Sequence, residues 1–124
     1  MMYSIVYLNN RGEKDAIGLI CINQERKLFV FQILDNEVEI FKSNNKNLEL
    51  LIDTTIDRYK QNLNALQKNF KNNESLEPFY LMTSNENGII RFSQFRDSLP
   101  SSIYNKFPPF LSEVETMLSP VPYN

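Results

Sequence analysis

The stretch AIGLICINQERKLFVFQI, residues 16–33, decides the fold class. It begins with the longest uninterrupted apolar run in the chain, Ala16 to Ile22. A short apolar run without polar alternation is typical of a strand covered on both faces, so we predict that Ala16 to Asn23 lies in the centre of a sheet. Gly18 within this run indicates a bulge or a close approach of another backbone. After a short polar turn, Lys27 to Ile33 predicts a neighbouring strand.

The sequence on either side extends these two strands into an α+β fold. Tyr3 to Leu8 is rich in β-branched and aromatic residues and precedes turn formers, so it predicts the first strand of a three-strand antiparallel meander. From Asn47 onward, apolar residues recur at spacings of three and four, which is the pattern of one helix face. The apolar positions of this predicted long helix are Leu48, Ile52, Ile56, Tyr59, Leu63, Leu66 and Phe70. We expect Asn47 to cap the helix and Asn72–Asn73 to end it.

The remaining segments predict shorter elements. Val38 to Phe41 fits either a fourth strand or part of a helix, and both interpretations stay open. Pro78 to Thr83 and Ile89 to Phe92 predict a C-terminal hairpin across a turn that contains Asn87–Gly88. Ser112 to Leu118 predicts a short final helix with the serine as its cap.

Length and composition bound the organisation of the chain. With 124 residues, of which 42% are hydrophobic, the chain fits one domain with its own core. Two independent domains would each be marginal at this size. We therefore predict a single α+β domain over residues 1–124. An antiparallel sheet, made of the N-terminal meander and the C-terminal hairpin, packs against one long amphipathic helix, and a short C-terminal helix follows.

Charge and residue usage exclude several classes of function. Lys and Arg total 13 against 15 Asp and Glu, so the net charge of -2 creates no overall attraction to nucleic acid or anionic lipid. The absence of histidine excludes Ser–His and Cys–His catalytic pairs. Cys21, the single cysteine, lies in the apolar run, and we interpret it as core packing. No segment predicts a signal peptide or a membrane span, so we expect a cytoplasmic protein without a membrane partner.

The first candidate site is the charged segment Arg11-Gly12-Glu13-Lys14-Asp15. It carries side chains of both signs between two apolar strands, which suits partner binding through Arg11, Glu13, Lys14 and Asp15. A solvated hairpin loop explains the same composition, because surface loops are polar by default. The segment also offers the one enzymatic alternative, acid–base chemistry by a carboxylate beside a cation.

The second candidate site is an aromatic-basic segment within residues 91–110. It suits partner binding through Arg91, Phe95 and Arg96. Single-stranded nucleic-acid sites also pair aromatic faces with cations, so the segment predicts an alternative nucleic-acid site. That alternative site comprises Arg91, Phe92, Phe95, Arg96, Tyr104 and Lys106. A third interpretation places the rings, together with Phe107 and Phe110, in the core, and the exposure of the rings distinguishes these interpretations.

An acidic row on the predicted helix raises the question of a metal site. Glu49, Asp53 and Asp57 recur every four residues and therefore lie on one side of the helix. Carboxylates in one row rarely converge on a cation without ligands from elsewhere, so we predict no metal site. The three glycines lie far apart and form no phosphate-binding loop, and we expect no cofactor.

Short patterns near both ends of the chain carry a family resemblance. The first comprises Tyr3-Ser4-Ile5-Val6-Tyr7, then Arg11-Gly12-Glu13 and Ile17-Gly18-Leu19-Ile20. The second is Ile90-Arg91-Phe92-Ser93 with the following Arg96. Both resemble an uncharacterised family of short bacterial proteins that are often encoded beside HipA-like kinases. The family typically has an asparagine before the Ile-Gly pair, where this chain has Ala16. The resemblance implies no activity, only a partner role near a kinase-like toxin.

Together these observations favour a small, non-catalytic interaction module. Such a module binds and modulates another protein, in the manner of an accessory or antitoxin-like factor. The resemblance makes a kinase-like toxin the first candidate partner. Nucleic-acid binding ranks second because of the net charge, an enzyme that uses the Arg11–Asp15 segment ranks third, and the sequence leaves the oligomeric state open.

Overall fold

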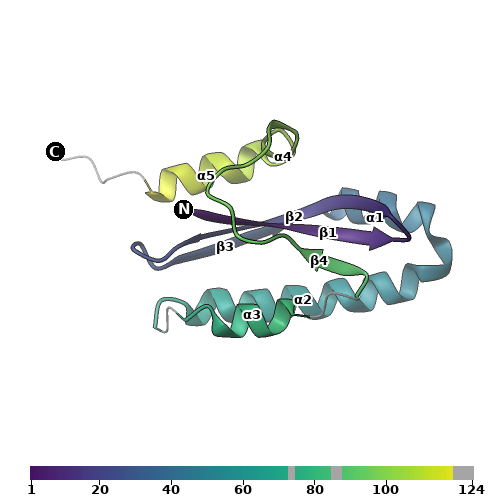
Figure 1. Cartoon of the computed structure of the whole chain (residues 1–124), viewed down its shortest axis with the longest axis horizontal. Coiled ribbons are helices and arrows are strands. Elements are labelled where there is room, and N and C mark those ends of the chain that lie inside the picture. Colours follow the sequence, from purple (N-terminus) through teal and green to yellow (C-terminus); the bar gives the residue numbers. More distant parts are fainter. Residues whose placement is uncertain (73–74, 85–87, 119–124) are drawn as a thin grey trace.

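The structure is a computed structural model of the chain and describes residues 1–72, 75–84 and 88–118 (Figure 1). Its strands are β1 (Met2–Asn10), β2 (Glu13–Asn23), β3 (Leu28–Ile33) and β4 (Ile90–Phe92). Its helices are α1 (Asp35–Asn44), the 3₁₀ turn η1 (Lys46–Leu48), α2 (Glu49–Asn69), α3 (Glu77–Thr83), α4 (Ser101–Tyr104) and α5 (Pro108–Leu118). The predicted α+β class, with an antiparallel sheet, one long helix and a short C-terminal helix, is confirmed.

The four strands form one sheet in the order β3-β2-β1-β4, and each neighbouring pair is antiparallel. The first three strands follow one another in space as in sequence, so the predicted meander is confirmed. β2, which carries the long apolar run, lies inside the sheet. β4 comes from far along the chain and forms the edge next to β1.

A bulge bends β2 where the glycine occurs. The register shifts between Val6 and Tyr7 on β1, and Ile17 is the extra residue on β2. A Cβ atom at Gly18 would lie 2.6 Å from the Ile33 side chain on β3. The sequence left a bulge and a close approach open as alternatives, and both occur here.

Helices cover both faces of the sheet, so the fold has three layers (Figure 1). The first layer, α1 to α3, buries one face. From the strands, that core contains Val6, Leu8, Ile17, Ile20, Ile22, Phe29 and Ile90. The layer of α4 and α5 buries the other face, whose strand residues are Ile5, Ala16, Leu19, Cys21 and Val30. The predicted burial of both faces of the apolar run is therefore confirmed.

The predicted long helix is confirmed as α2, but both of its ends differ from the prediction. Asn47 is exposed within η1 and does not cap the helix, which begins at Glu49. Asn47 lies inside the 3₁₀ turn that precedes α2, in which the Leu48 N–H donates to the Asn45 carbonyl at 2.9 Å. It is therefore not at the position of a helix cap. At the other end α2 stops at Asn69, before the predicted asparagine pair.

The open question about Val38 to Phe41 is answered by α1. Val38 and Phe41 are buried in the core, while Glu39 between them is exposed. A spacing of three residues puts both apolar side chains on one helix face, whereas on a strand they would point to opposite faces.

The predicted C-terminal hairpin is wrong, because Pro78 to Thr83 belongs to α3. The proline lies in the first turn, where a helix needs no N–H donor. Phe79 and Met82, three residues apart, both pack against the core. Ile90–Phe92 is a strand, but it pairs with β1. The predicted turn residues 85–87 lie outside the described residues.

The final helix is longer than predicted. α5 begins at Pro108, and Pro109 also lies in its first turn, where proline is tolerated. Ser112 is therefore an exposed residue inside the helix and not its cap. The buried side chains of α5 are Phe110, Leu111 and Val114.

Candidate interaction groove

A groove of about 830 Å³ runs along the β4 edge of the sheet. Its lining comes from β1, β2, α3 and residues 91–96, so it brings together distant parts of the sequence. We call it the β4 groove. Its lining residues are Tyr7, Lys14, Phe79, Tyr80, Thr83, Arg91, Phe92, Ser93, Gln94, Phe95 and Arg96.

Ser93 fixes the chain at the end of β4. Its N–H donates to the Ile5 carbonyl at 2.8 Å, and its hydroxyl oxygen accepts from the Ile5 N–H at 2.8 Å. Three residues further on, Arg96 and Tyr3 exchange two backbone hydrogen bonds of 2.7 and 2.9 Å. The segment between these contacts bulges but stays beside β1, which holds the floor of the groove in place.

One wall of the β4 groove carries three cations. Arg91 lies opposite Tyr7, and Arg96 lies opposite Tyr3. Opposed residues share a face of a sheet, and both tyrosines pack on the face that α4 and α5 cover. The Lys14 Nζ atom lies 3.9 Å from the centroid of the Tyr7 ring, a cation–π contact on the same side. Among the described residues no carboxylate lines the groove, although the chain has a net charge of -2.

The other wall of the β4 groove is aromatic. The Phe92 ring lies 5.4 Å from that of Tyr59 and 5.9 Å from that of Phe79, measured between ring centroids. The Phe95 ring lies 5.2 Å from Phe79 and 5.7 Å from Tyr80. Phe79 is buried, whereas Tyr80 is 54% exposed. The rings therefore form a supported apolar surface that solvent still reaches.

The charged segment 11–15 is a tight turn that runs into β2. Arg11 and Gly12 have φ angles of 51° and 88°, as a two-residue hairpin turn of type I′ requires. Arg11 and Glu13 are exposed at this end of the hairpin, while Lys14 lines the β4 groove. The segment therefore supplies one side chain to the groove.

Asp15 points into an ion-pair cluster instead. The Lys106 Nζ atom lies 3.0 Å from Asp15 Oδ1 and 3.4 Å from Glu37 Oε2, and it donates to the Ala16 carbonyl at 2.7 Å. These contacts connect the segment before α5 with β2 and α1. Asp15 and Lys106, which the sequence marks as binding residues, thus join structural elements.

The aromatic-basic segment is divided between the two faces of the sheet. Phe92 and Phe95 line the β4 groove, whereas Phe107 and Phe110 are buried between the sheet and α5. Tyr104 is exposed on α4. The core interpretation is therefore confirmed for Phe107 and Phe110, and the aromatic residues of this segment do not form one continuous exposed patch.

Two carboxylates of the acidic row bind a lysine. The Lys42 Nζ atom lies 2.8 Å from Asp53 Oδ1, 3.1 Å from Glu39 Oε1 and 3.9 Å from Glu49 Oε1. Two hydrogen bonds raise the pKa of Lys42 above its ordinary value: the one to Asp53 contributes most, and the one to Glu39 contributes less. Asp57 is exposed. In the described parts of the chain, no three His, Cys, Asp or Glu side chains are grouped to hold a metal ion.

Cys21 is buried on the face of β2 that α5 covers. Burial raises the pKa of its thiol to about 12, so the thiol stays protonated and a poor nucleophile at neutral pH. The interpretation of Cys21 as core packing is confirmed.

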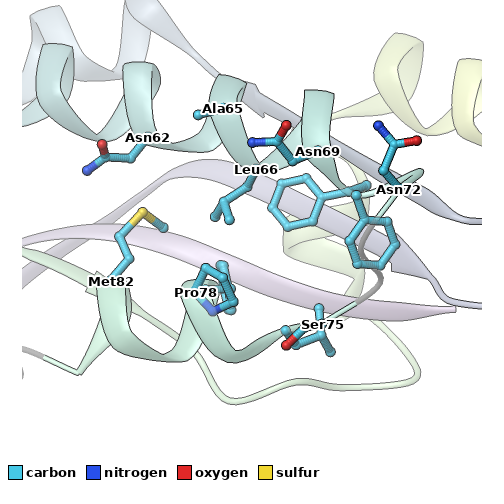
Figure 2. A pocket seen from close by; sticks show the side chains of 12 residues that line it. Asn62, Ala65, Leu66, Asn69, Asn72, Ser75, Pro78 and Met82 are labelled. Atoms are coloured by element: carbon cyan, nitrogen blue, oxygen red, sulfur yellow. The ribbon is translucent and has the colours of Figure 1, made fainter.

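A second concave site, the α2–α3 cleft, is one that the sequence analysis missed (Figure 2). It has a volume of about 490 Å³, and three buried rings, Phe29, Phe70 and Phe79, form its floor. Figure 2 shows Asn62 and Asn69 of α2 on one rim, with α3 on the other. The described lining residues carry no charge, so the cleft suits a neutral ligand. Phe79 also lines the β4 groove, so this ring contributes to both concave sites.

Comparison with known proteins finds no relative of this chain. No family model matches it, and neither a curated protein nor a solved structure does. Within the described residues, no helix combines the length and the apolar character needed to cross a membrane. Function must therefore be argued from the geometry of the site.

Proposed function

We propose that this protein is a small interaction module that binds and modulates another protein through the β4 groove. The observation that carries the proposal is the convergence of two segments that the sequence marks separately. Lys14 of the charged segment lies in one groove with Arg91, Phe95 and Arg96 of the aromatic-basic segment. Four of the seven residues predicted to bind a partner thus share one surface.

The chemistry of the groove supports a protein partner. Aromatic residues and arginine supply much of the binding energy at protein interfaces. Phe79 already holds the rings of Phe92, Phe95 and Tyr80 in place, so a partner would have few side chains to order. The three cations would steer an acidic partner toward this edge of the sheet.

The resemblance suggests where to look for that partner. Because the resembling family is often encoded beside HipA-like kinases, a kinase-like toxin is the first protein to test. In this proposal the module acts in the cytoplasm as an accessory or antitoxin-like factor, and it needs no cofactor.

Photo-crosslinking tests the proposed surface. The photoreactive residue p-benzoyl-phenylalanine replaces Tyr80 at the groove or, as a control, Leu50 on α2, which is 80% exposed. In the cells that produce the protein, we expect one discrete protein adduct from position 80 and none from position 50. Adding Arg91→Glu and Arg96→Glu to the position-80 protein should abolish the adduct, because both cations would become repulsive to an acidic partner.

Two outcomes would contradict the proposal. The first is an adduct of the same mass from both positions, which would show random collision. The second is no protein adduct from position 80 when the candidate kinase-like toxin is co-expressed.

Nucleic-acid binding remains the second candidate, favoured by one observation. Of the six predicted contact residues, Arg91, Phe92, Phe95 and Arg96 line the β4 groove, whereas Tyr104 and Lys106 lie elsewhere. Oligodeoxythymidine that binds at low salt, weakens steeply as salt rises and is lost in Arg91→Glu would support this function. Absence of binding at low salt would end it. The enzymatic alternative gains no support, since Arg11, Glu13 and Asp15 do not gather with Lys14 in the groove.

A further inference from the structure

Two cations, Lys14 and Arg91, lie beside one tyrosine near the end of the β1–β2 hairpin. Tyr7 on β1 lies opposite Arg91 on β4, and the Lys14 Nζ atom lies 3.9 Å from the centroid of the Tyr7 ring. Lys14 on β2 lies opposite Asn9, which shares a face of the sheet with Tyr7. The two cations therefore reach the same part of the β4 groove from two different strands.

Neighbouring side chains hold both cations. In the amide orientation that satisfies both of its side-chain atoms, Asn9 accepts a hydrogen bond from Arg91 Nε at 3.3 Å and donates one to the Glu13 carbonyl at 3.3 Å. The two terminal nitrogens of Arg91 have no partner among the described residues, so their fork is available to an oxyanion. The contact with the Tyr7 ring restrains Lys14. Both cations are thus partly ordered before a ligand binds.

The protein does not neutralise this pair of charges. Lysines elsewhere form ion pairs with carboxylates, as Lys60 does with Asp35 at 2.8 Å. In the described part of the chain, no carboxylate pairs with Lys14 or Arg91. Glu13 precedes Lys14 on β2, so its side chain points to the opposite face of the sheet. A ligand with two negative charges would neutralise the pair, whereas a single carboxylate would leave one cation uncompensated.

We propose that the partner binds with a phosphorylated side chain, whose phosphate group lies between Lys14 and Arg91 while neighbouring residues pack on the aromatic wall of the β4 groove. This inference rests on the proposed function and names the chemistry of the partner. A phosphate monoester carries a charge of about -1.5 to -2 at neutral pH and has three acceptor oxygens. These oxygens match the donors of an arginine fork and an ammonium group.

Arg96 adds a second contact at a defined distance. It lies opposite Tyr3, four positions along β1 from Tyr7, which corresponds to about 13 Å on an extended strand. An extended peptide covers this distance in about four residues, so we expect an acidic residue about four positions from the phosphorylated one. The aromatic wall favours a partner segment over a free phosphate compound, because a compound of that size would leave Tyr80 and Phe95 uncovered.

Synthetic peptide libraries test the phosphate specificity. Ten-residue libraries carry phosphoserine, phosphotyrosine, serine, tyrosine or glutamate at a fixed central position and random residues elsewhere, and the full-length protein is the bait. We expect enrichment only from a phosphorylated library, with an acidic residue about four positions from the centre and apolar residues near it. An enriched peptide should bind at least about tenfold more tightly than its unphosphorylated copy.

Substitutions test which cations bind the phosphate. Affinity for an enriched peptide should fall about tenfold or more in Arg91→Gln and in Lys14→Gln. Lys68→Gln removes the same charge from an exposed part of α2 and should change affinity by less than about twofold. Arg91→Lys keeps the charge but loses the fork, so it should recover only part of the affinity. Asn9→Ala should weaken binding less than Arg91→Gln does, because it frees the guanidinium without removing it.

The pH dependence of binding separates a phosphate from a carboxylate. A phosphate monoester loses one of its two charges below its second pKa of about 6, so affinity for the phosphopeptide should fall between about pH 7.5 and pH 5.5. A glutamate copy of the peptide should bind with the same affinity at both values, because carboxylates ionise near about pH 4. The chain contains no histidine that would titrate in this range.

The outcomes separate this inference from the proposed function. Glutamate peptides that bind as tightly as phosphorylated ones, no enrichment from any library, or an affinity that survives both Arg91→Gln and Lys14→Gln would overturn the phosphate site. Free phosphoserine that binds as tightly as the whole peptide would also overturn it, in favour of a small phosphate compound. The crosslink from position 80 would still support a protein partner in those cases. If that crosslink also fails and oligodeoxythymidine binds more tightly than any phosphopeptide, both proposals fall together.

Discussion

Gly18 has only a hydrogen atom in place of a side chain, and this allows β2 and β3 to lie close together. The sequence identified this position because glycine inside an apolar run indicates a bulge or close approach. It could not indicate which neighbours come close, since Ile33 and Gln32 reach the site through strand pairing. Local composition thus predicted a constraint at this position. The tertiary contacts with β3 determine which atoms impose it.

Replacement of this glycine should be costly. In Gly18→Ala the new Cβ would lie 3.0 Å from the Gln32 carbonyl oxygen, a backbone atom with little freedom to move. We expect the free energy of unfolding to fall by about 1–3 kcal/mol, as for other overpacked cores, measured by urea titration. Asn64→Ala on the exposed side of α2 should change it by about 0.5 kcal/mol or less. Equal stabilities of the two variants would show that the approach at Gly18 is not tight.

The buried thiol should make stability depend on alkaline pH. An unfolded cysteine ionises near pH 8.5, about three to four units below the folded Cys21 thiol, whose pKa is raised to about 12. Between these values the unfolded chain binds fewer protons than the folded one, so the free energy of unfolding falls as pH rises. The cysteine contributes a slope of about 1.4 kcal/mol per pH unit in this window and none below it.

Urea titrations of the wild type and of Cys21→Ala at about pH 7.5 and pH 10.5 isolate this contribution from other titrating groups. The variant should lose less stability than the wild type on going to the higher pH. Parallel losses in the two proteins would show that the thiol ionises equally in both states.

Among the elements, α2 and α3 show where sequence patterns succeed and fail. α2 was predicted because its apolar residues recur at helical spacing over about six turns. A pattern of that length outweighs the helix or strand propensities of single residues. α3 has only seven residues, rich in aromatic and apolar side chains that suit strands as well as helices. The segment is helical because Phe79 and Met82 then both pack against the core. A sequence pattern of only seven residues does not reveal this tertiary contact.

Adjacent residues of α3 should differ sharply in their effect on stability. Phe79 is buried among Phe29, Phe92 and Phe95, so Phe79→Ala should lower the free energy of unfolding by about 3–5 kcal/mol. Tyr80 is half-exposed, and Tyr80→Ala should cost about 1 kcal/mol or less. Chemical denaturation of both variants measures the difference. Similar losses would argue against Phe79 as the ring that organises the aromatic wall.

For the whole molecule, the sequence marked candidate binding residues but not the groove that four of them share. Lys14 and Arg91 lie far apart in the chain and meet only because β1 pairs with β2 on one side and β4 on the other. Such long-range pairing leaves no local signature, and the predicted hairpin partner for β4 was wrong. The α2–α3 cleft had an even weaker local signal, the small Ala65 side chain between Asn62 and Asn69.

The three-layer arrangement predicts that removal of one layer exposes the sheet. A chain that ends at Leu99 lacks α4 and α5 and leaves Ile5, Leu19 and Val30 without cover. Each fully buried aliphatic side chain stabilises a fold by about 1.5–3 kcal/mol, so this chain should melt earlier, bind an apolar dye and self-associate. Sedimentation and thermal melting measure these changes, with a chain ending at Leu118 as control. A stable chain of residues 1–99 with the sedimentation behaviour of the control would contradict the role given to α5.

The position of β1 in the middle of the sheet has a consequence for synthesis. β1 is made before β4, and its contact with the β4 segment joins residues 88 positions apart, as between Ile5 and Ser93. At about 5–20 residues per second, the ribosome needs about 4–18 s to deliver that partner. During this interval β1 has no partner on its β4 side and the face that α4 and α5 later cover is bare. We therefore expect ribosome-associated chaperones to bind the emerging chain.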